Sequence, residues 1–224
     1  MLTQPTSISK LFQHNNQQNL FTMRILKMYI SNINDRFMDE VIDTLRNGGI
    51  IIYPTDTLYA IGCNALNNNA IERICKIKGI NPQRTNLSIV CSDISQASQY
   101  ARIDNRAYQL LRENLPGAFT FILPAASTLP KVFKGRKTVG VRVPDNVIAR
   151  EIASRLGNPI LTTSIEWDDE PEDGTNPQSI AMKYENDVDI VIDGGYGELA
   201  PSTIVDCTDS ANPGITREGK GELN

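Results

Sequence analysis

The alternation of two kinds of segment constrains the fold of this chain most. About seven short apolar segments bounded by turn residues are typical of buried strands: residues 50–53, 87–91, 119–123, 138–143, 160–163, 188–192 and 203–206. Segments with helical spacing of apolar residues lie before and between them, at residues 38–45, 70–78, 94–100, 106–114, 146–156 and 178–184. This order predicts an α/β fold, a twisted sheet of about seven strands with helices on both faces.

The sheet is expected to be mixed, because residues 119–123 and 138–143 are joined by a segment with no convincing crossover helix. Local signals support the helices. Asp104 and Asp145 are predicted N-caps, Pro177 a first-turn proline and Gly157 a stop signal.

Composition sets the domain organisation. Residues 1–22 are rich in Gln, Asn, Ser and Thr and predict a loosely ordered extension, followed by one domain at 23–224. With 40% hydrophobic and 21% charged residues, the chain resembles an ordinary globular protein. No apolar run approaches the roughly 20 residues of a membrane span, and no secretory signal is present. We therefore expect a cytoplasmic protein without membrane association.

The supply of histidine and cysteine excludes several chemistries. His14 is the only histidine, so no Ser-His-Asp triad and no histidine-based metal site is expected. The four cysteines, at 63, 75, 91 and 207, form no CxxC pair and are predicted to be reduced core residues. No metal ligands are assigned.

A polar cluster follows the apolar segment 50–53, with Thr55, Asp56 and Thr57 directly after Pro54. Ligands of α/β proteins bind at strand ends, and two hydroxyls beside a carboxylate suit an amino acid. The alternative is an ordinary turn in which the Asp caps its own backbone.

Basic residues provide the second signal, although the net charge is −4. Arg142 lies within an apolar strand segment and requires an anion, either a structural carboxylate or a ligand phosphate. Lys78 ends a helix, where it complements the helix dipole or reaches a phosphate. The run Lys131, Lys134, Arg136 and Lys137 is either a solvated loop or an RNA-binding surface.

Several motifs in order resemble the YrdC-like superfamily. They are Pro54-Thr55-Asp56-Thr57, Lys78-Gly79, Pro116-Gly117-x-x-Thr120, Val141-Arg142-Val143-Pro144, Thr162-Thr163-Ser164, Pro201-Ser202-Thr203-Ile204-Val205-Asp206 and Arg217-Glu218-Gly219. The region from Lys131 to Val143 looks most like the YciO branch. The resemblance implies an α/β fold with a concave basic surface. It also implies synthesis of threonylcarbamoyl-adenylate from L-threonine, bicarbonate and ATP, with Mg²⁺ on the phosphates, in tRNA modification.

The resemblance also implies site residues, position by position. Thr55, Thr57 and Tyr59 match the threonine and bicarbonate pocket. The positions around ATP are Lys78, Thr120, Arg142, Thr163, Ser164, Ser202 and Arg217, among which Lys78 and Ser164 are the catalytic candidates. Lys131, Lys134, Arg136 and Lys137 are candidates for contact with RNA, including double-stranded RNA.

Two positions depart from the synthase pattern. Ile80 stands where the pattern has an arginine, and Glu166 where it has an asparagine. Losing one charge-assisted contact costs about 3 kcal/mol of transition-state stabilisation, roughly a hundredfold in rate. Arg84, in the following loop, is a candidate substitute for the missing arginine. The acidic stretch 166–173 is predicted to be a solvated loop, with lid or metal roles as alternatives.

Three hypotheses remain open. The first is a nucleotide- and RNA-binding protein with weak or altered adenylate chemistry, and the second is an active synthase. The third is an interaction domain whose inherited pocket is empty.

Overall fold

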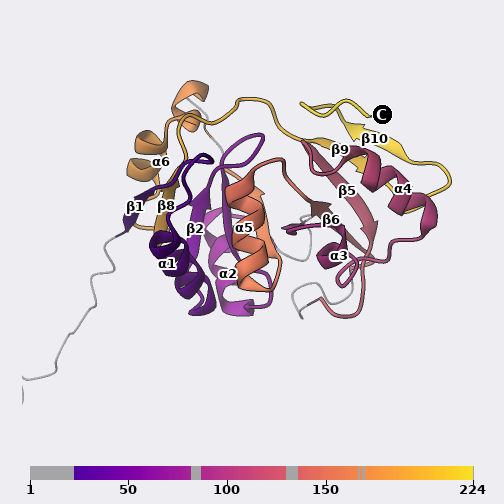
Figure 1. Ribbon diagram of the computed structural model, residues 1–224, viewed down its shortest axis with the longest axis horizontal. Coiled ribbons are helices and arrows are strands. Elements are labelled where there is room, and N and C mark those ends of the chain that lie inside the picture. Colours follow the sequence, from indigo (N-terminus) through magenta and orange to yellow (C-terminus); the bar gives the residue numbers. More distant parts are fainter. Residues whose placement is uncertain (1–22, 82–86, 130–135, 166, 168–169, 224) are drawn as a thin grey trace, which may run out of the picture.

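The computed structural model describes residues 23–81, 87–129, 136–165, 167 and 170–223, and it has a mixed α/β fold (Figure 1). The strands of its sheet are β1 (Arg24–Lys27), β2 (Ile50–Tyr53), β3 (Ala60–Asn64), β4 (Ser88–Val90), β5 (Phe119–Pro124), β6 (Thr138–Arg142), β7 (Ile160–Ser164), β8 (Ile190–Asp193), β9 (Thr203–Asp206) and β10 (Gly214–Arg217). Their spatial order is β1-β8-β2-β3-β7-β4-β6-β5-β9-β10. The sheet is mixed, as predicted, since β2 is parallel to β8 and antiparallel to β3.

The described residues contain ten strands rather than about seven, because three short strands were not predicted. β1 and β10 are the two edge strands, and three of the four residues of β1 and all four of β10 are exposed. They therefore lack the apolar pattern of a buried strand. β3 carries Gly62, where a Cβ would lie 2.6 Å from the Cγ2 of Ile160. The glycine that weakens the strand pattern is thus required by a close approach of the neighbouring strand.

All six predicted helices are present: α1 (Asp35–Arg46), α2 (Asn68–Ile77), α3 (Ile94–Ala97), α4 (Asn105–Asn114), α5 (Val147–Leu156) and α6 (Pro177–Lys183). Asp104 caps α4 as predicted, and Pro177 lies in the first turn of α6. Gly157 ends α5 with a φ of +73°. The prediction for Asp145 is wrong: Asn146 caps α5 by accepting a hydrogen bond from the backbone N–H of Ala149.

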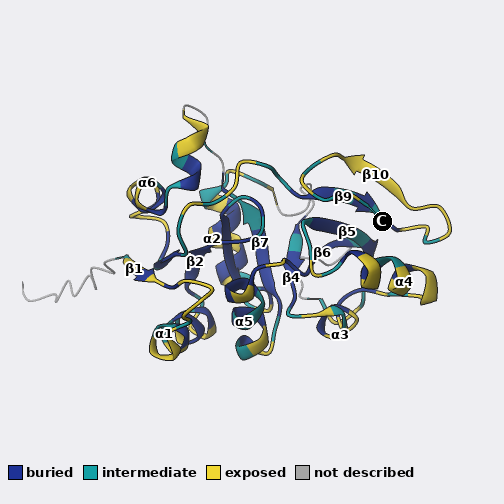
Figure 2. Cartoon of the chain, turned by 45° about the horizontal axis from the view of Figure 1, so that its top comes forward, coloured by how far each residue is buried: buried dark blue, intermediate teal, exposed yellow. Residues whose placement is uncertain are grey.

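The helices cover both faces of the sheet (Figure 2), and alternate residues of β2 belong to different apolar clusters. Ile51 and Tyr53 of β2 face the apolar cluster formed with α1 and α5. Ile50 and Ile52 face the larger cluster, which includes residues of α2, α3, α4 and α6. The prediction of a doubly covered sheet is therefore confirmed.

The four cysteines are free and buried within these clusters, as predicted. Burial raises the pKa of the Cys63 and Cys91 thiols far above the usual range. In the described part of the chain, no helix is both long enough and apolar enough to cross a membrane.

The parallel strands determine where loops gather. β1, β8 and β2 run in the same direction, so their carboxyl ends meet at one edge of the sheet. The loop after Tyr53 and the loop after Asp193 therefore lie side by side. They touch closely: a Cβ on Gly194 would lie 2.6 Å from the Cγ of Pro54. Ligand sites of α/β sheets are typically found at such an edge.

A matched pair of glycines tests the backbone at the end of α5. Gly157 and Gly214 both have open space where a Cβ would be, but only Gly157 has a positive φ. We expect Gly157→Ala to lower the free energy of unfolding by about 1 kcal/mol, because an L-residue is strained in the left-handed region. Gly214→Ala should change it by less than about 0.5 kcal/mol. Urea denaturation of both variants measures the difference, and equal effects would contradict this account.

Candidate functional site

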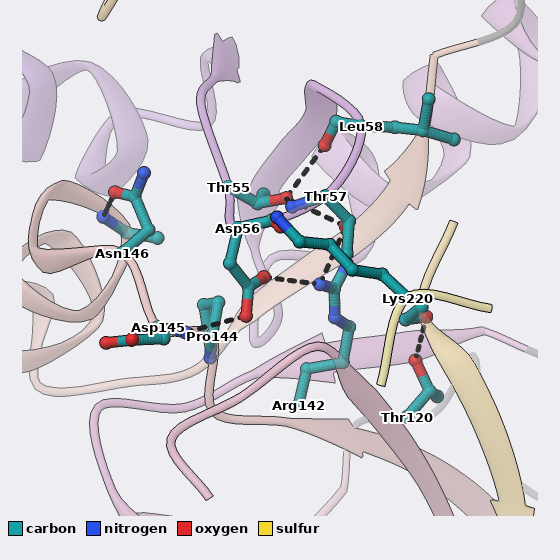
Figure 3. A network of polar contacts seen from close by, with 12 residues as sticks. Thr55, Asp56, Thr57, Leu58, Thr120, Arg142, Pro144, Asp145, Asn146 and Lys220 are labelled. Carbon is teal, nitrogen blue, oxygen red and sulfur yellow. Dashed lines mark hydrogen bonds and ion pairs between the residues drawn. The ribbon is translucent and has the colours of Figure 1, made fainter. Parts of the chain in front are cut away.

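The centre of the site is a buried ion pair between Arg142, the last residue of β6, and Asp56 in the loop after β2 (Figure 3). Their side chains are only 6% and 8% exposed, and the Nη2 of Arg142 lies 3.0 Å from the Oδ1 of Asp56. The other carboxylate oxygen accepts a hydrogen bond of 2.8 Å from the backbone N–H of Asp145. Of the two partners expected for Arg142, the structure shows the structural carboxylate.

Asp56 leaves part of the guanidinium unused. Nη2 also donates to the Oγ1 of Thr57, at 3.0 Å, so both contacts of Arg142 come from one nitrogen. The Nε of Arg142 is buried and has no hydrogen-bond partner among the described residues. A buried N–H without an acceptor is costly. An oxygen atom from a ligand or from water is therefore needed beside Arg142.

Hydroxyl groups hold the loop that carries Asp56. The Oγ1 of Thr55 accepts from the backbone N–H of Thr57 at 3.0 Å and donates to the carbonyl oxygen of Leu58 at 2.8 Å. The Oγ1 atoms of Thr55 and Thr57 are 3.0 Å apart. A series of hydrogen bonds thus runs from the guanidinium of Arg142 through the hydroxyls of Thr57 and Thr55 to the carbonyl oxygen of Leu58. Two predicted threonine-pocket residues are engaged in shaping this loop.

A second group of predicted residues lies beside Arg142: Thr120 on β5, Ser202 just before β9, and Arg217 at the end of β10. The hydroxyls of Thr120 and Ser202 are 2.8 Å apart. The Nη2 of Arg217 donates to the carbonyl oxygen of Ser202 at 2.7 Å. Burial and the positive charge of Arg142 both lower the pKa of Arg217, so the two guanidinium groups are close enough to repel each other. The structure therefore gathers four of the other predicted residues around Arg142: Thr57, Thr120, Ser202 and Arg217.

Tyr59 has a different position. Its ring is fully buried, and its hydroxyl donates to the carbonyl oxygen of Gly195 at 2.7 Å and accepts from the N–H of Gly194 at 3.1 Å. Burial raises the pKa of Tyr59 to about 12. These contacts anchor the glycine loop after β8. A contact between Tyr59 and threonine stays a prediction.

Lys78 and Ser164, the predicted catalytic residues, contact each other. Lys78 follows α2, and its Nζ donates to the carbonyl oxygen of Ser164 at 3.1 Å. Ser164 pairs with Ala60 of β3, and the N–H of Ile165 donates to the carbonyl oxygen of Tyr59 at 3.1 Å. This end of β7 therefore adjoins the loop that carries Asp56 and Thr57. Thr163 points to the opposite face of the sheet from Ser164, because adjacent strand residues alternate.

A cleft of about 500 Å³ opens where the loops meet. It is lined by Ile30, Pro54, Thr55, Asp56, Pro116, Gly117, Ala118, Asp145, Asn146, Gly194, Tyr196, Gly197, Glu198, Lys220 and Gly221. The charges on this lining are mixed, with three acids and only Lys220 as a base. No group of three or more His, Cys, Asp or Glu side chains suited to a metal gathers in the described ranges.

The site contains residues that sequence reasoning did not assign. Asp56 was noted only as part of a polar cluster, and its partner Arg142 is 86 residues away. Lys220 and the loop from Gly194 to Glu198 were not predicted at all. The glycines after the strand 188–192 were the only available signal for that loop.

The predicted RNA-binding run and one of the two departures fall largely outside the described residues. Lys131, Lys134 and Glu166 lie there, as does Arg84. Arg136 is half-buried and Lys137 is exposed. Ile80, the other position that departs from the synthase pattern, packs against the larger apolar cluster. The side chain at this position is therefore an apolar packing contact.

Fold and site define a mixed α/β protein with a cleft beside a buried Arg142–Asp56 pair, where the loops after β2 and β8 meet. The Sua5/YciO/YrdC family model, described as "Telomere recombination", matches residues 43–219. The chain therefore belongs to the Sua5/YciO/YrdC family, as the sequence motifs predicted.

The relatives by sequence include uncharacterised proteins and a threonylcarbamoyl-AMP synthase. The chain is 39% identical to an uncharacterised protein, YciO, of Escherichia coli, over 86% of this chain and 93% of that one. It is 43% identical to an uncharacterised protein of Haemophilus influenzae, over 83% and 90%. It is 30% identical to the threonylcarbamoyl-AMP synthase of Bacillus subtilis, over 83% of this chain and 54% of the synthase.

Solved structures of YciO and of Sua5 also match this chain. The crystal structure of E. coli YciO matches with a TM-score of 0.82 at 37% identity, covering 89% of this chain and 97% of that one. The structure of P. abyssi Sua5 complexed with L-threonine matches with a TM-score of 0.78 at 29% identity, covering 87% and 57%.

Removing one partner of the buried pair should be far more damaging than removing an exposed carboxylate. We expect Asp56→Asn to lower the free energy of unfolding by about 3 kcal/mol or more, because it leaves a buried guanidinium without its anion. Asp145→Asn is the matched control. Asp145 pairs with Arg150 but is 69% exposed, so the expected loss is below about 1 kcal/mol. Urea denaturation measures both, and a small effect of Asp56→Asn would show that the pair is not a structural requirement.

Proposed function

We propose that this chain is a cytoplasmic nucleotide-binding protein that takes ATP and L-threonine in the cleft and forms threonylcarbamoyl-adenylate slowly. The observation that carries the proposal is the fixed, partly unpaired guanidinium of Arg142. Asp56 and Thr57 hold it in one orientation, and its Nε lacks an acceptor among the described residues. Anionic oxygens of a ligand supply what this nitrogen lacks.

Relatives support the choice of ligands. A protein 30% identical to this chain is a threonylcarbamoyl-AMP synthase, and a solved structure 29% identical to it contains L-threonine. The cleft volume of about 500 Å³ lies within the usual range for small-molecule sites. The hydroxyls of Thr57, Thr120 and Ser202 supply hydrogen-bonding groups beside the guanidinium.

The proposed reaction suits the residues present. Joining L-threonine, bicarbonate and ATP requires positioned reactants and positive charge near the phosphates, without a protein nucleophile. Arg142 and Arg217 supply that charge, and no histidine is needed. Because no carboxylate cluster of metal-binding size occurs in the described ranges, Mg²⁺ would be held mainly by phosphate oxygens and water.

The slow rate is proposed from the residues around Lys78. Lys78 lies near Ser164, and the residue two positions after Lys78 is the apolar, packed Ile80 instead of a cation. A departing pyrophosphate is therefore less well stabilised there. The contacts that hold Arg142 come from other residues, Asp56 and Thr57.

ATP binding can be tested without leaving a buried charge unpaired. We expect the double variant Asp56→Leu with Arg142→Met to fold and to bind ATP at least tenfold more weakly than the parent, because the fixed guanidinium is lost. Isothermal titration calorimetry measures the affinities, and Arg150→Ala, which changes a partly exposed arginine, is the control. Equal ATP affinity in the double variant and the parent, or no ATP binding by the parent at millimolar concentration, would remove the nucleotide proposal.

Restoring the family residues should restore synthesis. We expect Ile80→Arg with Glu166→Asn to raise the rate of threonylcarbamoyl-adenylate formation by roughly a hundredfold. Each single change should help less, because groups acting on the same phosphates couple instead of adding. Chromatography of the adenylate gives the rates.

Two outcomes would contradict the proposed slow synthesis or its cause. The parent turning over at about 1 per second or faster would make it an active synthase. A double variant that folds and binds ATP but gains no activity would mean that another difference limits the chemistry.

A further inference from the structure

We infer that Lys220 is an anion-binding residue of the cleft, where it binds a carboxylate or phosphate of the ligand in place of Glu198. This inference rests on the proposed function and adds a cation that the family motifs did not assign. It is carried by the position of Lys220, the weakness of its present ion pair and the shortage of other bases on the cleft lining.

Hydrogen bonds and close packing fix the backbone around Lys220. Its N–H donates to the carbonyl oxygen of Pro201 at 2.8 Å, and the carbonyl oxygen of Gly221 accepts from the Oγ1 of Thr203 at 2.6 Å. The glycines on either side allow this close packing. A Cβ on Gly219 would lie 2.4 Å from the Pro201 carbonyl oxygen, and one on Gly221 would lie 2.7 Å from the ring of Phe119. Lys220 is therefore held in position by β9 and by the start of β5.

From this fixed backbone position, the side chain of Lys220 extends toward the loop after β2, as Figure 3 shows. Its Nζ donates to the backbone carbonyl oxygen of Asp56 at 3.0 Å. The carboxylate of Asp56 holds Arg142 at the same time. Lys220 and Arg142 thus bind to different groups of one residue, so two cations flank the same loop.

The remaining contact of Lys220 is easily exchanged. Its Nζ lies 3.1 Å from the Oε1 of Glu198, and the two side chains are 40% and 54% exposed. An exposed pair of this kind contributes little to stability. An ammonium group has three N–H donors, and the contacts within the described ranges use two. A ligand anion can therefore take the third donor and then displace Glu198 with little loss.

Lys220 is the only basic residue on a lining that carries three acids, one of which, Asp56, is already paired with Arg142. An anion in the cleft therefore has a favourable partner on the lining only at Lys220. Arg217, three residues earlier on the same segment, is already crowded by Arg142. A ligand anion between Arg142 and Arg217 reduces the repulsion between their two guanidinium groups. Lys220 thereby supplies positive charge in a chain that lacks a cation at Ile80.

Opposite effects of two variants distinguish ligand binding from a merely structural link. We expect Lys220→Ala to weaken binding roughly tenfold, as the loss of a charge-assisted hydrogen bond does, and Lys220→Arg to retain most of it. Glu198→Gln should strengthen binding about twofold to fivefold, because it removes the competing carboxylate. Lys76→Ala, at an exposed position on α2, is the control for removing a lysine.

Calorimetry with four probes identifies the anion that Lys220 binds. The probes are inorganic pyrophosphate, ATP, L-threonine and L-threoninol, which lacks the carboxylate. A tenfold loss with pyrophosphate and ATP assigns Lys220 to phosphate. A loss with L-threonine that is absent with L-threoninol assigns it to the carboxylate.

The results separate this inference from the proposed function. Unchanged affinity of Lys220→Ala for every probe that the parent binds would overturn the inference. So would a parallel loss of affinity and melting temperature in Lys220→Ala and Glu198→Gln, which indicates a structural link. If pyrophosphate binding requires Lys220 but the parent binds neither ATP nor L-threonine, the proposed function falls and the inference stands.

Discussion

The buried pair of Arg142 and Asp56 is the contact on which the site depends. It joins β6 to a loop 86 residues away, and through the N–H of Asp145 it also fixes the segment that leads into α5. Two charges at this depth lose much hydration, so neither is stable there without the other. The loop after β2 must therefore fold across the sheet toward β6. This requirement explains why Thr55, Thr57 and Asp56 act as one unit.

This constraint also prepares the site for a ligand. Because Asp56 and Thr57 share one nitrogen of Arg142, the orientation of the guanidinium is set before any ligand arrives. Fixed charges cost little reorganisation when they meet a developing or incoming negative charge. A chain whose only histidine lies outside the described residues can in this way bind anions by position and charge alone.

Hydrophobic periodicity was sufficient to predict the six α-helices and seven of the ten strands in the described residues, but not the short 3-10 helix at Pro171–Thr175. It missed β10, whose four residues are all exposed, and β3, where Gly62 allows Ile160 to approach. Order along the chain also predicted that Arg142 would need an anion, but not which one, since pairing over 86 residues is decided by the folded loop. Lys220 had no signal, because its proposed role depends on where hydrogen bonds to Pro201 and Thr203 hold this segment.

The different contacts of the two groups of predicted residues explain how the proposed binding can persist while synthesis slows. Arg142 is held by Asp56 and Thr57, whereas Lys78 donates to the carbonyl oxygen of Ser164. Ile80 changes the charge only near Lys78, and it also fills space against the apolar cluster. In the proposed reaction, a substitution there weakens stabilisation of the departing phosphates and leaves the contacts of Arg142 with Asp56 and Thr57 unchanged. Transition-state stabilisation is thereby reduced more than ground-state binding, and a loss of this kind lowers the rate without emptying the site.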